Sequence, residues 1–144
     1  MNVKADKMRY QLNKASYGLI LLGLSISVIA MFRIITPVTV RPNYEIAIEI
    51  MINIVLLLVT FLAAERCKFY SKHWAFASIA IGLIHLARIF YVPASLLRKD
   101  MLSYPQFIII ALLLVISSLL ISLGGYITWV KYNILSKHMK ALSE

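Results

Sequence analysis

Four runs of apolar residues, each long enough to cross a lipid bilayer, constrain this sequence more than any other feature. A transmembrane helix needs about 20 predominantly apolar residues, and the runs occupy residues 15–36, 44–64, 74–93 and 105–130. Hydrophobic residues fill 61% of the 144 positions, and the mean hydropathy is +0.83. That composition is too apolar for a soluble protein of this size. We therefore expect one integral membrane domain covering residues 1–144.

The connections between the runs are short, so successive helices should be antiparallel neighbours. Inside a bilayer every backbone polar group must be bonded within the protein, which favours helices for spans of this kind. Pro93 should end the third helix, and residues 94–104 should form the longest connection. Ser103 and Pro105 are typical of a helix start. The predicted fold is an all-α membrane protein, a four-transmembrane-helix up-down bundle.

The distribution of Lys and Arg predicts the orientation of this bundle. Ten of the 15 lie in the N-terminal tail, in the connection between the second and third runs, and in the C-terminal tail. By the positive-inside rule these segments face the cytoplasm. We expect both termini to be cytoplasmic and the protein to lie in the plasma membrane. The net charge of +9 does not indicate nucleic acid, because the cations flank apolar runs and form no single basic face.

Polar residues interrupt two of the apolar runs. The third run contains His85 and Arg88, and an arginine in hydrocarbon is costly enough to be a candidate site whose partner must be found. The second run carries Glu45, Glu49 and Asn53 at four-residue spacing, which places them on one helical stripe. We expect this stripe to supply the partners of Arg88.

Depth in the membrane brings these polar groups together. At about 1.5 Å rise per residue, Arg33, Glu49 and Arg88 each lie roughly 6 to 7 Å from the outer ends of their helices. We expect an outward-facing cavity lined by the polar cluster, with an arginine and a tyrosine near its mouth. The candidate ligand-binding residues are Glu49, Asn53, His85, Arg88, Arg33, Glu45 and Tyr91.

Three functions compete for this cluster. In the first, it binds or transports a polar or anionic small molecule, an ion or a lipid headgroup; four helices enclose little space, so the protein would work as a homo-oligomer or with a membrane-protein partner. In the second, the cluster is an ion-pair network that closes a structural or accessory membrane subunit. In the third, the protein is a small membrane enzyme acting on a lipophilic substrate. The absence of a recognisable catalytic motif favours a non-enzymatic role.

The sequence predicts neither a metal site nor a cofactor. Cys67 is the single cysteine, which excludes an internal disulfide and a cysteine-based zinc site. Haem would need paired axial histidines at one depth, whereas His73 and His138 should lie near the cytoplasmic surface. A metal site built on His85 and a glutamate lacks a recognisable ligand spacing and has arginines nearby.

Overall fold

The chain folds into four long helices. The computed structural model describes residue 8, residues 10–36 and residues 44–143, and within these ranges the regular structure is helical. The helices are α2 (Lys14–Ile35), α3 (Tyr44–Cys67), α4 (Lys72–Arg98) and α5 (Tyr104–Ser143). All four are long and apolar enough to cross a membrane. The four predicted spans are therefore confirmed as helices, and the chain has the composition of an integral membrane protein.

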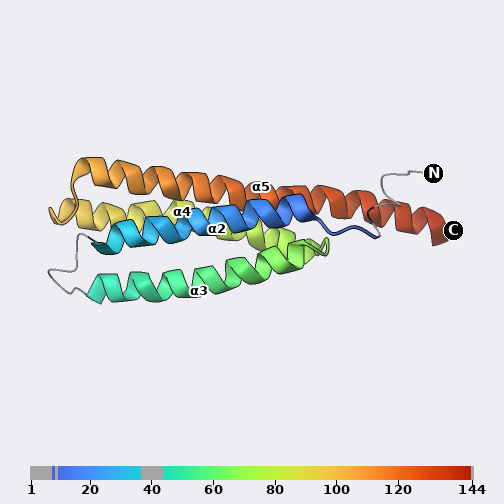
Figure 1. The fold of residues 1–144 in the computed structure, drawn as a ribbon, viewed down its shortest axis with the longest axis horizontal. Helices are drawn as coiled ribbons and strands as arrows, with labels where there is room; N and C mark the ends of the chain where they lie inside the picture. Colours follow the sequence, from blue (N-terminus) through green and yellow to red (C-terminus); the bar gives the residue numbers. More distant parts are fainter. Residues whose placement is uncertain (1–7, 9, 37–43, 144) are drawn as a thin grey trace.

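The helices lie lengthwise beside one another as a four-helix bundle (Figure 1). Helix α5 packs extensively against α2 and α4, whereas α3 packs less extensively against the same two helices. Helices α3 and α5 touch at only a few described positions, so they occupy opposite corners of the bundle. Helix α3 is thus the least tightly held of the four.

Small residues allow the tightly packed helices to approach closely. A Cβ atom added at Gly82 of α4 would lie 2.9 Å from the backbone carbonyl oxygen of Ser118 on α5. One added at Gly125 would lie 2.6 Å from the carbonyl oxygen of Ala75. The Ser118 hydroxyl donates to the Gly82 carbonyl at 2.7 Å, and Ser117 donates in the same way to Gly23 at 2.8 Å. Close backbone approach and interhelical hydrogen bonds of this kind hold membrane helices together.

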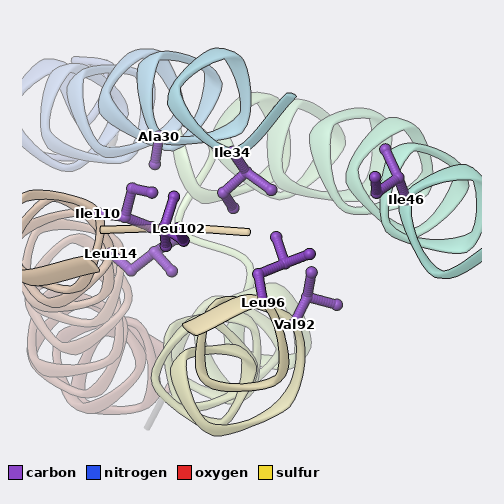
Figure 2. Packing of buried hydrophobic residues seen from close by; sticks show 8 residues of the cluster. All are labelled: Ala30, Ile34, Ile46, Val92, Leu96, Leu102, Ile110 and Leu114. Atoms are coloured by element: carbon purple, nitrogen blue, oxygen red, sulfur yellow. The ribbon is translucent and has the colours of Figure 1, made fainter. Parts of the chain in front are cut away.

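Two apolar clusters fill the interior. The first, which we call the Leu96 core, gathers side chains from all four helices and from the α4–α5 connection (Figure 2). Its buried members are Ala30, Ile34, Ile46, Val92, Leu96, Leu102, Ile110 and Leu114. The second cluster includes Ile20, Ala63, Cys67, Ile81 and Ile121. Along both α3 and α4, the buried residues of the predicted polar cluster lie between the residues of the first cluster and those of the second.

Two helices are longer than predicted. Pro93 lies inside α4, which continues to Arg98, so the expectation that Pro93 ends the helix and that residues 94–104 form a loop is wrong. Proline is tolerated inside membrane helices because neighbouring groups can satisfy the freed backbone carbonyl. Helix α5 has 40 residues and runs 13 beyond the predicted end at Val130. Its C-terminal part carries no membrane-length apolar pattern, so hydropathy alone did not reveal it.

Candidate functional site

The polar residues of α3 and α4 meet across the interface between these helices. Glu49 and Asn53 lie one turn apart on α3, and His85 and Arg88 lie one turn apart on α4. Each of the four side chains is at most 7% exposed. The structure therefore brings together the central four of the predicted site residues, which we call the Arg88 cluster.

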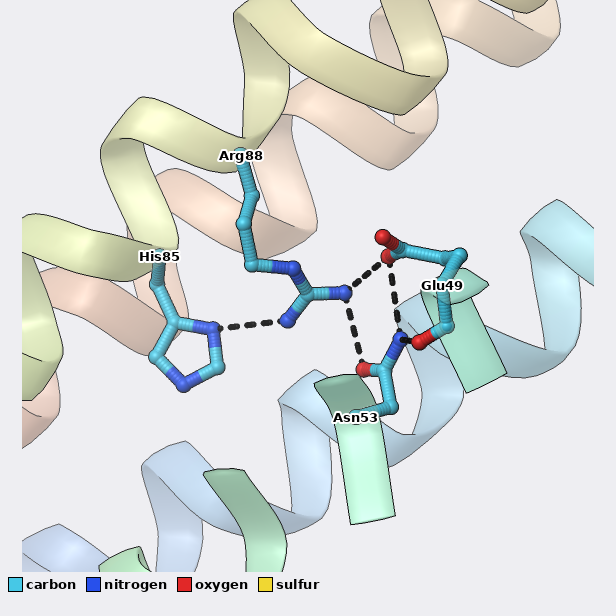
Figure 3. Close-up of polar contacts among 4 residues, drawn as sticks. All are labelled: Glu49, Asn53, His85 and Arg88. Carbon is cyan, nitrogen blue, oxygen red and sulfur yellow. Dashed lines mark hydrogen bonds and ion pairs between the residues drawn. The ribbon is translucent and has the colours of Figure 1, made fainter. Parts of the chain in front are cut away.

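The Arg88 cluster is bonded mainly within itself (Figure 3). Nη2 of Arg88 donates to Oε1 of Glu49, forming an ion pair, and to Oδ1 of Asn53 at 2.8 Å. The Asn53 amide donates to the same Glu49 oxygen at 2.9 Å and to the Glu49 backbone carbonyl at 2.8 Å. Asn53 thus bonds to both the Glu49 carboxylate and the Arg88 guanidinium and holds them together. The two opposite charges are paired away from water.

His85 completes the cluster on the α4 side. Its Nδ1 atom lies 3.2 Å from Nη1 of Arg88. An arginine nitrogen can only donate, so Nδ1 accepts this hydrogen bond, and the proton of the neutral imidazole lies on Nε2. The ring therefore orients the guanidinium from the side opposite Glu49. His85 is also at the wall of a small cavity, described below.

Two polar atoms of the cluster remain without a hydrogen bond among the described residues. They are Oε2 of Glu49 and Nε of Arg88. A buried polar atom left unpaired costs about 1 to 3 kcal/mol, so the cluster is not fully satisfied. Removing either charged partner would cost more, about 3 to 5 kcal/mol, because the other charge would stay buried alone.

The cavity beside the cluster is very small. It lies between α2, α3 and α4 and has a volume of about 10 Å³, with Ser27, Asn53, Thr60 and His85 as its polar lining. Such a volume holds about one water molecule, whereas small-molecule sites measure roughly 300 to 1,000 Å³. The Arg88 cluster contributes Asn53 and His85 to the wall of this cavity, and Glu49 and Arg88 are not among its lining residues. The outward-facing cavity expected around this pair stays a prediction.

The remaining predicted site residues lie elsewhere or outside the description. Arg33 is exposed on α2 and lines a separate cleft shared with α5. Tyr91 is 62% exposed, since the buried face of α4 continues from Arg88 to Val92. The side chain of Glu45 lies outside the described residues. Neither Arg33 nor Tyr91 is hydrogen-bonded to the Arg88 cluster in the structure as described.

A second polar network, not anticipated from the sequence, joins the start of α2 to the middle of α5. Asn13 donates to the Thr128 hydroxyl at 3.2 Å and accepts from Nζ of Lys131 at 2.8 Å. The hydroxyls of Ser16 and Thr128 are 2.6 Å apart. The Asn13 backbone N–H also donates to the Lys68 carbonyl at 2.9 Å. The signal available in the sequence was the position of Asn13 just before an apolar run, where asparagine favours a helix start.

Possible metal ligands are sparse in the described part of the chain, where no group of three or more His, Cys, Asp or Glu side chains gathers. Within the Arg88 cluster the His85 Nδ1 atom and one Glu49 oxygen are both engaged by arginine. The Arg88 cluster as built is thus an internal ion pair braced by an amide and an imidazole.

Comparisons with known proteins assign no family. No family model matches the chain, and neither the curated proteins nor the solved structures contain a significant match.

Proposed function

We propose that the chain is a plasma-membrane protein whose four helices cross the bilayer in alternating directions, with both termini in the cytoplasm. The supporting pattern is the placement of ten of 15 basic residues in the two tails and in the α3–α4 connection. The whole of residues 1–144 then forms one membrane domain.

Within that membrane, the function best supported by the geometry is that of a non-enzymatic structural or accessory subunit. One observation carries this proposal: Arg88 directs both of its Nη groups to buried partners of its own chain. A ligand-binding arginine needs a donor facing an accessible space, and the cavity beside this cluster holds about one water. The Arg88 cluster then serves to fix α3, the least packed helix, against α4.

A buried ion pair whose role is structural can be replaced by apolar side chains without loss of the fold. Exchanging a buried ion pair for hydrophobic residues of similar volume is often neutral or stabilising. The double variant Glu49→Met with Arg88→Met should therefore remain folded, while either single variant is destabilised. If the protein is an accessory subunit, the wild-type chain and the double variant should migrate in the same complex, larger than the chain itself, on native gels of crosslinked membranes. Migration of the wild-type chain as a monomer would refute the accessory role.

A second candidate, binding or transport of a polar or anionic ligand at the Arg88 cluster, is favoured by the two unpaired atoms, Glu49 Oε2 and Arg88 Nε. A ligand that binds only the folded state raises the melting temperature as its concentration increases. Titration with phosphate and with acetate therefore tests this function directly. A rise in melting temperature in the wild type that disappears in the double methionine variant would favour it over the structural role.

A further inference from the structure

A cleft separate from the Arg88 cluster opens between the end of α2 and the start of α5. Its volume is about 460 Å³, within the range of small-molecule sites. Helix α2 contributes Ile29, Phe32 and Arg33 to its walls, and α5 contributes Gln106, Ile109 and Ile110. The cleft is thus large enough for part of a lipid molecule.

The polar groups of this cleft lie near one end of its walls. Arg33 is in the last turn of α2, and Gln106 is in the first turn of α5. Ile29 and Ile110 are each one helical turn, about 6 Å, further along their helices and away from these ends. The cleft therefore has donors at the end formed by Arg33 and Gln106 and apolar walls further along both helices, which matches the division between a lipid headgroup and its acyl chain.

Among the described residues, nothing neutralises the charge of Arg33 in this cleft. Unlike Arg88, Arg33 is exposed and has no hydrogen-bond or ion-pair partner in the described part of the chain. Oε1 of Gln106 accepts from the Ser103 backbone N–H at 3.2 Å, which leaves the amide nitrogen of Gln106 as a donor. Two donor side chains and one uncompensated cation favour an anion at this position.

We propose that this cleft binds one anionic phospholipid. Its phosphate lies against Arg33 and Gln106, and one acyl chain follows the slot formed by Ile29, Phe32 and the isoleucines of α5. The planar guanidinium can hold two phosphate oxygens at once, and basic pockets between membrane helices recognise lipid headgroups. This site requires the protein to be in a bilayer but does not depend on the role of the Arg88 cluster.

Native mass spectrometry of the full chain, released from detergent micelles with phosphatidylglycerol or phosphatidylcholine of identical acyl chains, tests the proposal. We expect one phosphatidylglycerol to be retained preferentially. Arg33→Gln should weaken that retention about tenfold, the effect of one charge-assisted hydrogen bond, and Arg33→Lys should preserve part of it. Arg98→Gln is the matched control, because Arg98 is also an exposed arginine in the last turn of its helix and does not line the cleft.

A second pair of variants tests the apolar slot. Ile109→Trp should fill it and reduce retention of both lipids, whereas Leu112→Trp adds the same bulk at an exposed α5 position outside the cleft lining. Equal retention of the two lipids by the wild type, or equal losses in Arg33→Gln and Arg98→Gln, would overturn the proposal. Displacement of the lipid by millimolar inorganic phosphate would overturn it in favour of a free-anion site. Circular dichroism of each variant establishes that its helices are intact.

Discussion

Arg88 of α4 and Glu49 of α3 form an ion pair across the interface between these two helices, and neither side chain is more than 7% exposed. One partner, Glu49, lies on α3, the helix that packs least against the others. The ion pair therefore joins α3 to α4 where the packing between helices is less extensive than that of α5 with α2 or α4. We expect the attachment of α3 to the bundle to depend on these two charges.

Reversing one charge of this pair should destabilise the protein strongly. Glu49→Arg or Arg88→Glu alone places two like charges together in a buried site, so we expect a loss of at least about 3 to 5 kcal/mol in the free energy of unfolding. The exchanged double variant restores opposite charges and should recover part of the loss, which a double-mutant cycle measures. Thermal unfolding in detergent provides the comparison.

The matched control for this experiment is the partly exposed pair of Glu65 and Lys68, whose charged atoms are 3.7 Å apart. Surface ion pairs contribute about 0 to 1 kcal/mol, so Glu65→Lys should change the melting temperature little. Single reversals at Glu49 and Arg88 with effects as small as this control would show that the buried pair does not hold α3.

A methyl group at Gly82 should separate α4 from α5. The new Cβ atom would lie 2.9 Å from the Ser118 carbonyl oxygen, and overpacking of this kind costs about 1 to 3 kcal/mol. Gly18→Ala is the control, since a Cβ atom there meets nothing within 4 Å and alanine favours a helix by about 0.5 to 1 kcal/mol. Melting temperatures should therefore shift in opposite directions. A Gly82→Ala protein as stable as the wild type would contradict the close approach of these helices.

The orientation can be measured with single cysteines in a Cys67→Ala background. Cysteine at Asp100, an exposed position between α4 and α5, should react with a membrane-impermeant maleimide in intact cells. Cysteine at Lys137, which is exposed on the C-terminal part of α5, should react only after permeabilisation. The reverse pattern would place both termini outside the cytoplasm.

Asn13 should anchor the start of α2 to α5. The variant Asn13→Ala loses the bonds to Thr128 and Lys131, and each buried polar group left unpaired costs about 1 to 3 kcal/mol. We expect faster hydrogen exchange in the first turns of α2, with little change in the Leu96 core. Gln11→Ala, at an exposed neighbouring position, should leave exchange unaltered. Equal exchange in both variants would mean that the Asn13 network does not stabilise this end.

Much of the Arg88 cluster could be predicted because spacing alone fixes which residues share a helical face. The four-residue interval between Glu49 and Asn53 and the three-residue interval between His85 and Arg88 each equal about one turn. Because a charge buried in a membrane is costly, the two polar residues of α3 are expected to face the two polar residues of α4. Depth and periodicity were sufficient for these residues, and the structure brings all four together.

The position of Arg33 shows that depth in the membrane does not determine the direction in which a side chain points. Its distance from the helix end is similar to that of Glu49 and Arg88, which predicts that Arg33 joins the cluster, but its direction around α2 differs. The buried stripe of α2 ends at Ile34, and adjacent helical residues point about 100° apart. The rotation of α2 is set by its small-residue contacts with α5, so Arg33 faces another cleft. Tyr91 is exposed for the same reason, since a residue's direction depends on which side of the helix its neighbours occupy.

The length of α5 makes the two ends of the molecule mechanically unequal. Forty residues of α-helix measure about 60 Å, about twice the hydrocarbon thickness of a bilayer, and the excess projects beyond the bundle at the C-terminal end (Figure 1). The 13 residues beyond Val130 measure about 20 Å, so a tilt of about 5° moves the helix tip by about 2 Å. Because α5 is one continuous helix, its projecting end must follow any tilt of the longer part that is packed among the other helices.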